Sequence, residues 1–446
     1  MNKVKLGDCI ELIIDNRGKT PPLAETGYEL IETVSINGSN KYPDYSKITK
    51  FVSEETYNTW FRKGHPTSGD ILISTVGMNI GDVVIMKSNR GSIAQNLIAL
   101  RTNNKLNSDY LYYILTSKNI REKIRSLNIG SAQPSLKVPH LLNIEFYLPN
   151  IEKQSEISKI LNELDEKIEL NTQINQTLEQ IAQTIFKSWF IDFDPVHAKA
   201  NALASGQTAE QATQAAMAVI SGKNTQELHR LQTANPEQYQ QLWEIADAFP
   251  SGFSGYKNLG EIPIGWNVLT FKDFISESKE KIGSLEDVPE YSVGNEGIYP
   301  RSEKYNKSLS KTPEKNKVVR IGDLVFGMGS KTLNWGIMND EIGSVSPAYF
   351  VYRIFTNINY IYLNKYIKAK EYDFQNLIKP TSRQGQSVDK EMFLKKEIYV
   401  PNEYLLNIYL NKLKEIDSLV YSYTTEVLIL EQIRDELLPK LLSGEI

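Results

Sequence analysis

Residues that could do chemistry are scattered through this 446-residue sequence rather than grouped. No histidine lies near the single cysteine, Cys9, so the spacing of a zinc site is absent. No glycine-rich loop ends in Lys-Ser or Lys-Thr, and the segment GMGSKTLNWG, residues 327–336, fits a turn after a strand better than a phosphate loop. No Asn-Pro-Pro-aromatic run of an amino-methyltransferase occurs, and no two acidic residues are set apart for acid/base work. We therefore expect no catalytic residue, no metal ion and no cofactor in this chain.

Loops rich in amide, hydroxyl and basic side chains are the remaining candidates for function. Gln and Asn can form two hydrogen bonds to adenine and Arg two to guanine, while Ser, Thr and Lys suit phosphates. These loops lie at residues 14–22, 74–82 and 127–136, and again at residues 327–336 and 378–388. The candidate nucleic-acid-binding residues are Arg17, Lys19, Thr20, Thr75, Asn79, Ser131, Gln133, Ser135, Lys331, Thr332, Asn334, Ser382, Arg383, Gln384 and Gln386. A hydrated turn would explain each loop alone, but polar loops at corresponding places in two halves favour binding.

The two halves of the chain share one frame. The tripeptide Glu-Gln-Ile at residues 179–181 returns at residues 431–433, an offset of 252 residues (431 − 179). The pair Pro149-Asn150 and the single residue Asp165 also return at this offset, and Gly69-Asp70 returns at an offset of 253. A duplicated unit of about 190 residues explains these agreements best.

A long heptad pattern follows each Pro-Asn pair. The seam residues of the first helix are Ile157, Leu161, Leu164, Ile168, Asn171, Asn175, Leu178, Ala182, Ile185 and Trp189. Those of the second are Tyr409, Leu413, Ile416, Val420, Tyr423, Val427, Leu430, Arg434, Leu437 and Leu441. More than four heptads predict a coiled coil, and two equal helices in one chain favour an antiparallel pair. Packing of each helix on its own domain is the alternative.

The segments before each helix mix short β-prone runs, such as GDILIST and GDLVFGMG, with one helical stretch, so each copy is a mixed α and β domain. Between the copies, residues 194–260 begin with an Ala- and Gln-rich helical insertion and end in a Gly/Pro-rich connector.

Composition is that of a soluble globular protein, with 41% apolar and 23% charged residues and a length that implies several domains. We expect no transmembrane helix and no signal peptide, and the lone cysteine fits a reducing, cytoplasmic setting. The net charge is −4, yet residues 1–150 carry 18 basic against 14 acidic side chains and residues 261–400 carry 20 against 18. Two mildly basic segments in an acidic chain suit local contacts to nucleic acid, although ordinary surface charge would also explain them.

Taken together, these features resemble the DNA-specificity subunits of type I restriction-modification systems. The resemblance spans essentially the whole chain and is carried by the GD strand SGDILIST, the loop GSAQPSL, the helix start EKQSEISKILNELDEKIELN, and the segments QTIFKSWFIDFDPV, LGEIPIGW and IRDELLPKLLSGEI. It implies two pseudo-symmetric mixed α/β target-recognition domains, separated by two long helices that form an antiparallel coiled coil. It also implies that each domain binds half of a split site in double-stranded DNA.

The same resemblance implies partners. Two methyltransferase subunits would dock on the chain and bind S-adenosylmethionine, two motor-nuclease subunits would join them, and this chain would have no active site. The expected domains are residues 1–150 and 261–402 for recognition, 151–193 and 403–446 for the helices, and 194–260 for the insertion. A coiled-coil scaffold whose domains bind proteins, and an enzyme acting alone, are the alternatives.

Overall fold

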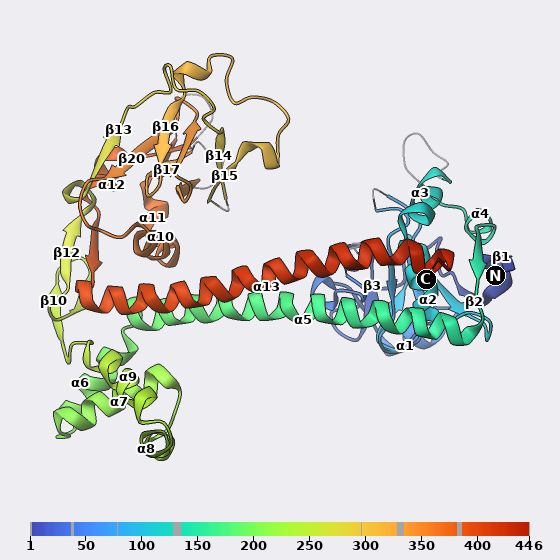
Figure 1. Ribbon diagram of the computed structural model, residues 1–446, viewed down its shortest axis with the longest axis horizontal. Coiled ribbons are helices and arrows are strands. Elements are labelled where there is room, and N and C mark those ends of the chain that lie inside the picture. Colours follow the sequence, from blue (N-terminus) through green and yellow to red (C-terminus); the bar gives the residue numbers. More distant parts are fainter. Residues whose placement is uncertain are drawn as a thin grey trace. The chain divides into compact units, whose positions relative to one another are not determined.

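The computed structural model describes residues 2–36, 40–77, 79–127, 135–295, 297–327, 334–380 and 386–445. The chain forms two compact units, residues 1–176 with 419–446, and residues 177–418. Two long helices, α5 (Ile151–Phe190) and α13 (Glu403–Ser443), contribute one end to each unit (Figure 1).

The first unit is built on a four-stranded antiparallel sheet with strand order β2-β8-β5-β6. Its strands are β1 (Asn2–Lys5), β2 (Ile10–Ile14), β3 (Tyr28–Ile31), β4 (Phe51–Val52), β5 (Ile71–Ser74), β6 (Val83–Ile85), β7 (Ser92–Ile93), β8 (Leu97–Thr102) and β9 (Glu145–Leu148). Its short helices are α1 (Glu54–Thr59), α2 (Ser108–Thr116), α3 (Lys118–Ser126) and α4 (Val138–Leu142). Strand β5 is buried along its whole length, as the apolar run after Gly69-Asp70 predicts, and the core extends to Ile157 and Leu441 of the long helices.

The second unit repeats this sheet with strand order β13-β20-β17-β18. Its strands are β10 (Phe253–Tyr256), β11 (Gly260–Pro263), β12 (Asn267–Thr270), β13 (Ile275–Ser278), β14 (Tyr291–Gly294), β15 (Gly297–Pro300), β16 (Lys317–Arg320), β17 (Leu324–Phe326), β18 (Trp335–Ile337), β19 (Ile342–Val345), β20 (Phe350–Ile354), β21 (Ile378–Pro380), β22 (Gln386–Val388) and β23 (Glu397–Val400). Its domain helices are α10 (Tyr360–Ala369), α11 (Glu371–Phe374) and α12 (Lys390–Lys395). Because Ile71 pairs with Leu100 and Leu324 pairs with Tyr352, the two sheets have the same register as well as the same order.

The repeated Gly-Asp pair has a physical explanation in both units. Gly69 and Gly322 have φ values of 87° and 82°, a conformation that favours glycine. The next residue, Asp70, is buried and accepts two hydrogen bonds from Arg101 at 2.9 and 2.8 Å. Asp323 accepts the matching pair from Arg353 at 3.0 and 2.9 Å. The duplication therefore includes a buried ion pair as well as the strands.

The two long helices run antiparallel within each unit (Figure 1). In the first unit, Asp165 pairs with Arg434 at 3.0 Å and Asn175 donates to Thr424 at 3.0 Å, so residue numbers rise along one helix as they fall along the other. In the second unit, the rings of Phe186 and Phe190 pack on Tyr409. Every predicted seam residue is buried or half-buried, so the predicted antiparallel helix pair is confirmed in each unit.

Residues 194–247 form four helices, α6 (Asp194–Ala204), α7 (Ala209–Ser221), α8 (Thr225–Ala234) and α9 (Pro236–Asp247). Lys199 on α6 is 5% exposed and its ammonium donates to the carbonyls of Ala246 and Phe249 at 3.3 and 2.7 Å. Burial lowers the pKa of Lys199. A cation at the carbonyl end of α9 is stabilised by the helix dipole, and it fixes α6 against that end.

Candidate nucleic-acid interface

Three segments of the first unit meet beside the end of strand β5, at residues 15–20, 74–76 and 94–96. Arg17 donates two hydrogen bonds to Asp15, at 2.8 and 2.7 Å, and a third to the hydroxyl of Thr75 at 3.1 Å. The hydrogen bonds from Arg17 lower the pKa of the Asp15 carboxyl, so this ion pair is charged at neutral pH. We call Asp15, Arg17, Thr20, Thr75, Gln95 and Asn96 the Arg17 cluster.

Gln95 and Asn96 of the Arg17 cluster form the turn that leads into strand β8. The amide and hydroxyl of buried Thr75 both donate to the carbonyl of Asn96, at 2.7 and 3.0 Å. Gln95 donates from Nε2 to the hydroxyl of Thr20 at 2.7 Å. Both amide side chains, Gln95 and Asn96, are exposed. The cluster therefore has a buried, hydrogen-bonded base and an exposed rim of amide groups.

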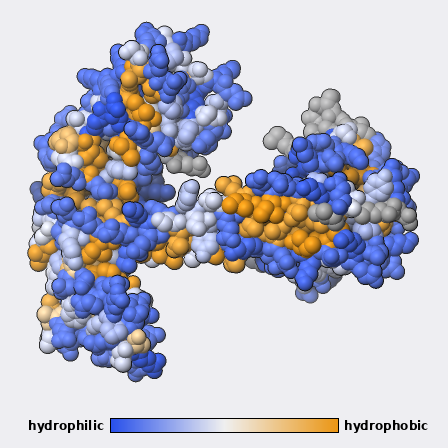
Figure 2. Space-filling view, viewed as in Figure 1, coloured by the Kyte–Doolittle hydropathy of each residue, from blue (hydrophilic) through white to orange (hydrophobic). Residues whose placement is uncertain are grey.

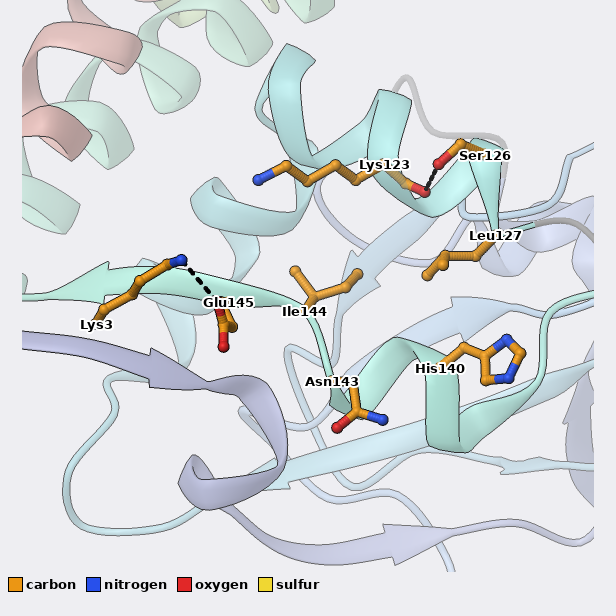
Figure 3. Close-up of a pocket in the computed structure, with 8 residues that line it drawn as sticks. All are labelled: Lys3, Lys123, Ser126, Leu127, His140, Asn143, Ile144 and Glu145. Carbon is orange, nitrogen blue, oxygen red and sulfur yellow. Dashed lines mark hydrogen bonds and ion pairs between the residues drawn. The ribbon is translucent and has the colours of Figure 1, made fainter.

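Basic side chains are concentrated on helix α3 of the first unit. Helix α3 has four basic residues and one acidic residue in nine positions. A pocket of about 400 Å³ opens between α3, α4 and β9, lined by Lys3, Lys123, Ser126, Leu127, His140, Asn143, Ile144 and Glu145 (Figure 3). Lys3 is paired with Glu145 at 2.7 Å, and the side chains of Lys123 and His140 point away from each other (Figure 3). The lining is therefore mixed, with Leu127 and Ile144 beside basic groups and one carboxylate.

The second unit places basic and aromatic side chains together around strands β14 and β15. The guanidinium of Arg301 lies 4.4 Å from the ring centre of Tyr305, and the ammonium of Lys304 lies 4.4 Å from that of Tyr299. Tyr305 is 48% exposed. Cation–π pairs of this kind present both a charge and an aromatic face, the two groups that nucleic-acid surfaces use.

The structure brings three of the predicted binding residues together, namely Arg17, Thr20 and Thr75. Lys19 and Asn79 are exposed on neighbouring turns, and Ser135 forms a β-bridge with Val76, next to Thr75. In the second unit, the carbonyl of Asn334 accepts a hydrogen bond from Gly327. Outside the described residues lie Ser131, Gln133, Lys331, Thr332, Ser382, Arg383 and Gln384, together with the side chain of Gln386.

Sequence reasoning missed Gln95, Asn96 and the aromatic-basic group around Arg301. The segment Ala94-Gln95-Asn96 sits between two apolar runs, and adjacent amides before a strand are the one signal that could have marked it. Arg301, Lys304 and the two tyrosines lie in a segment that has no counterpart motif in the first copy.

In the described part of the chain, no three His, Cys, Asp or Glu side chains are placed to hold a metal ion. Nor does any described helix have the length and apolar character needed to cross a membrane.

The fold defines a class of protein, a chain in which one mixed α/β unit occurs twice, each copy packed on ends of two long helices. A family model described as the type I restriction modification DNA specificity domain matches residues 1–180. The chain is 31% identical over 408 residues to the type I restriction enzyme HindI specificity subunit of Haemophilus influenzae, covering 85% of this chain and 86% of that protein. It is also 40% identical over 88 residues to the MjaIX specificity subunit of Methanocaldococcus jannaschii, 20% of each chain.

Among solved structures, the S subunit of a type I restriction-modification system from M. genitalium is similar with a TM-score of 0.49 and 14% identity, over 99% of this chain and 95% of that one. Because it shares 31% identity with the Haemophilus protein over most of both chains, this chain belongs to the family of DNA-specificity subunits of type I restriction-modification systems. The resemblance drawn from the sequence is therefore confirmed. The chain is a DNA-recognition component and not a catalytic one.

Proposed function

We propose that this chain binds a bipartite DNA sequence, with one half-site for each copy of the duplicated frame. The observation that carries the proposal is that the two copies share their sheets but differ in the polar groups around them. The two sheets share strand order, register and the buried Asp-Arg pair. The polar groups outside the shared strands differ, with the Arg17 cluster beside β5 in one copy and the Arg301 group beside the separate β14-β15 sheet in the other. A shared frame with unlike loops suits two half-sites of different sequence.

The recognition domains of this proposal are residues 1–150 and 261–402, and the helices at 151–193 and 403–446 form the spacer. Helix α5 has 40 residues, so its axis is about 60 Å long. As a coiled coil of this length, the helix pair would hold two DNA-binding domains about one to two helical turns of DNA apart. The four helices within residues 194–260 have no assigned role in DNA binding.

We further propose that two methyltransferase subunits dock on the chain and that motor-nuclease subunits can join them. The support is an apolar surface along the helices in the first unit, shown in Figure 2. Leu419, Ile429 and Ile433 of α13 lie within about 80° of one another around the helix axis and are between 40% and 52% exposed. Exposed apolar patches on one element mark interaction surfaces. S-adenosylmethionine would then be bound by the partner subunits, and the complex would act on cellular DNA in the cytoplasm.

Mapping methylated bases in the source cell tests the proposal, because it gives the recognised sequence directly. Two defined segments separated by a fixed number of unspecified base pairs are expected. Exchanging residues 261–400 for the corresponding domain of another family member should change one segment and leave the other. A contiguous site, or an exchange that changes both segments, would refute the two-domain model.

Binding to duplex DNA by the complex with its methyltransferase should fall steeply between low and moderate salt, because phosphate contacts release counterions. No DNA binding by that complex at any salt concentration would favour the scaffold alternative. Turnover by the purified chain alone, with DNA and S-adenosylmethionine, would favour the enzyme.

A further inference from the structure

Two consecutive residues with positive φ precede strand β8 in the first unit. Gln95 has a φ of 21° and Asn96 a φ of 66°. Neither is glycine, and positive φ is uncommon for side chains other than Asn and Asp. Such conformations persist where the surroundings hold them, and they concentrate at functional sites.

The structure shows what holds this turn. The carbonyl of Asn96 accepts two hydrogen bonds from Thr75, whose side chain and backbone are buried at the end of strand β5. The hydroxyl of Thr75 accepts in turn from Arg17, whose guanidinium is fixed by Asp15. Because Thr75 directly follows strand β5 and is buried, it anchors the turn at Gln95 and Asn96 to the end of the sheet.

The turn presents amide groups to solvent in a fixed orientation. Gln95 uses one Nε2 proton to bond Thr20. A carboxamide has two such protons and one acceptor oxygen, so one N–H and Oε1 remain for a ligand. This donor-acceptor pair matches N7 and N6 of adenine in the major groove.

We propose that Gln95 recognises an adenine in the half-site bound by the first copy, with Thr20 and the strained turn as its positioning groups. The inference rests on the proposed function, and it adds a specificity-determining residue outside the predicted loops. At the offset of 252, Pro347 and Ala348 occupy the places of Gln95 and Asn96. The second copy thus lacks this amide reader, in keeping with unlike half-sites.

The experiment uses the full-length chain in complex with its methyltransferase subunits and the recognition sequence found by methylation mapping. Affinity is measured for that duplex and for duplexes in which each defined base pair is replaced in turn. We expect Gln95→Ala to weaken binding to the intact site about 5- to 140-fold, the equivalent of 1–3 kcal/mol for one bidentate base contact. It should also abolish discrimination at a single A·T pair of the first half-site and leave every position of the second unchanged.

Three further variants separate recognition from folding. Thr20→Val keeps the shape but removes the hydroxyl partner of Gln95, so discrimination at the same base pair should fall by a smaller factor. Asn96→Gly tolerates the positive φ, so it should keep the fold and the preference of Gln95. Asn104→Ala removes an exposed amide beyond the opposite end of strand β8 and should change nothing.

Two results would overturn this inference while leaving the proposed function intact. One is a Gln95→Ala complex that binds and discriminates like the wild type. The other is a loss spread evenly over all positions of both half-sites, which would mark Gln95 as structural only. A wild-type complex with no preferred sequence would instead overturn the proposed function, and this inference with it.

Discussion

Lengthening the helix pair by one heptad should lengthen the unspecified gap between the two half-sites. The insertion has to be made in both helices at facing positions, and the Asn175–Thr424 hydrogen bond identifies them. A second copy of residues 168–174 placed after Ile174, with a second copy of residues 425–431 placed after Thr424, keeps Asn175 opposite Thr424. It also leaves the Asp165–Arg434 pair on the other side of the insertion undisturbed.

The magnitude follows from helix geometry. Seven residues at about 1.5 Å each add about 10 Å, which is about 3 base pairs at a rise of 3.4 Å. Three base pairs also rotate one half-site about 100° around the DNA axis. We therefore expect methylation mapping to give the same two half-sites with a gap up to 3 base pairs longer, bound more weakly than the original site.

Two controls make the result interpretable. The same seven residues inserted after Gly206, in the exposed turn between α6 and α7, should leave the gap unchanged. Insertion into α5 alone should mismatch the helices and abolish binding. If the double insertion folds and binds but its gap equals that of the wild type, the helix pair is not the spacer.

Three smaller perturbations test the frame and the charges. Replacing Arg101 or Arg353 by Met leaves a buried aspartate without its cation. We expect each substitution to destabilise its own unit by about 2–3 kcal/mol. This is less than for a fully buried ion pair, because each arginine side chain is about a third exposed. In urea unfolding, the emission of Trp60, the one tryptophan of the first unit, should shift its midpoint for the Arg101 variant and not for the other. Two arginines lower the pKa of Glu280 to about 2, so its stabilising contribution is present above pH 4.5 and is lost as the pH falls toward 2. Glu280→Gln should remove this part of the acid destabilisation, and identical acid unfolding curves would contradict the assignment. Lys123→Gln should reduce the slope of log K against log salt by about one at every sequence tested, and a sequence-dependent effect would exclude a simple phosphate contact.

The frame was predictable from the sequence because its determinants are local and repeated. Gly69 and Gly322 mark turns that need positive φ, and the apolar seam with Asn171 and Asn175 marks a helix pair. The Arg17 cluster was only partly predictable, since Arg17, Thr20 and Thr75 lie in polar loops but their meeting depends on strand order. Adjacent amides before a strand mark Gln95 and Asn96 only as a polar turn, because the hydrogen bonds that hold this turn come from Thr75, about twenty positions away. The positive φ values of these two residues follow from the fold, so residue types alone do not predict them.

The two copies also differ within their shared structure. The cation near the equivalent aspartate lies on the facing helix in the first copy and on the domain in the second. In the first copy, Asp165 accepts hydrogen bonds from Tyr113 at 2.7 Å and from Arg434 on the facing helix at 3.0 Å. At the offset of 252, Asp417 corresponds to Asp165 and Lys365 to Tyr113. The place of Arg434 is taken by Ala182, so the second copy has no cation on the facing helix at this level.

In the second copy, a positive charge near the exposed Asp417 comes from Lys365 of the domain. Burial lowers the pKa of Lys365, and the attraction of Asp417 acts against this decrease. An exchange of residues 261–400 therefore removes Lys365 but leaves Asp417 in the helix. A donor domain with an uncharged residue at position 365 should destabilise the second unit, and Ala182→Arg in the same chain should restore it. Urea unfolding of the two chimaeras decides the point, because equal stability would show that Asp417 needs no partner.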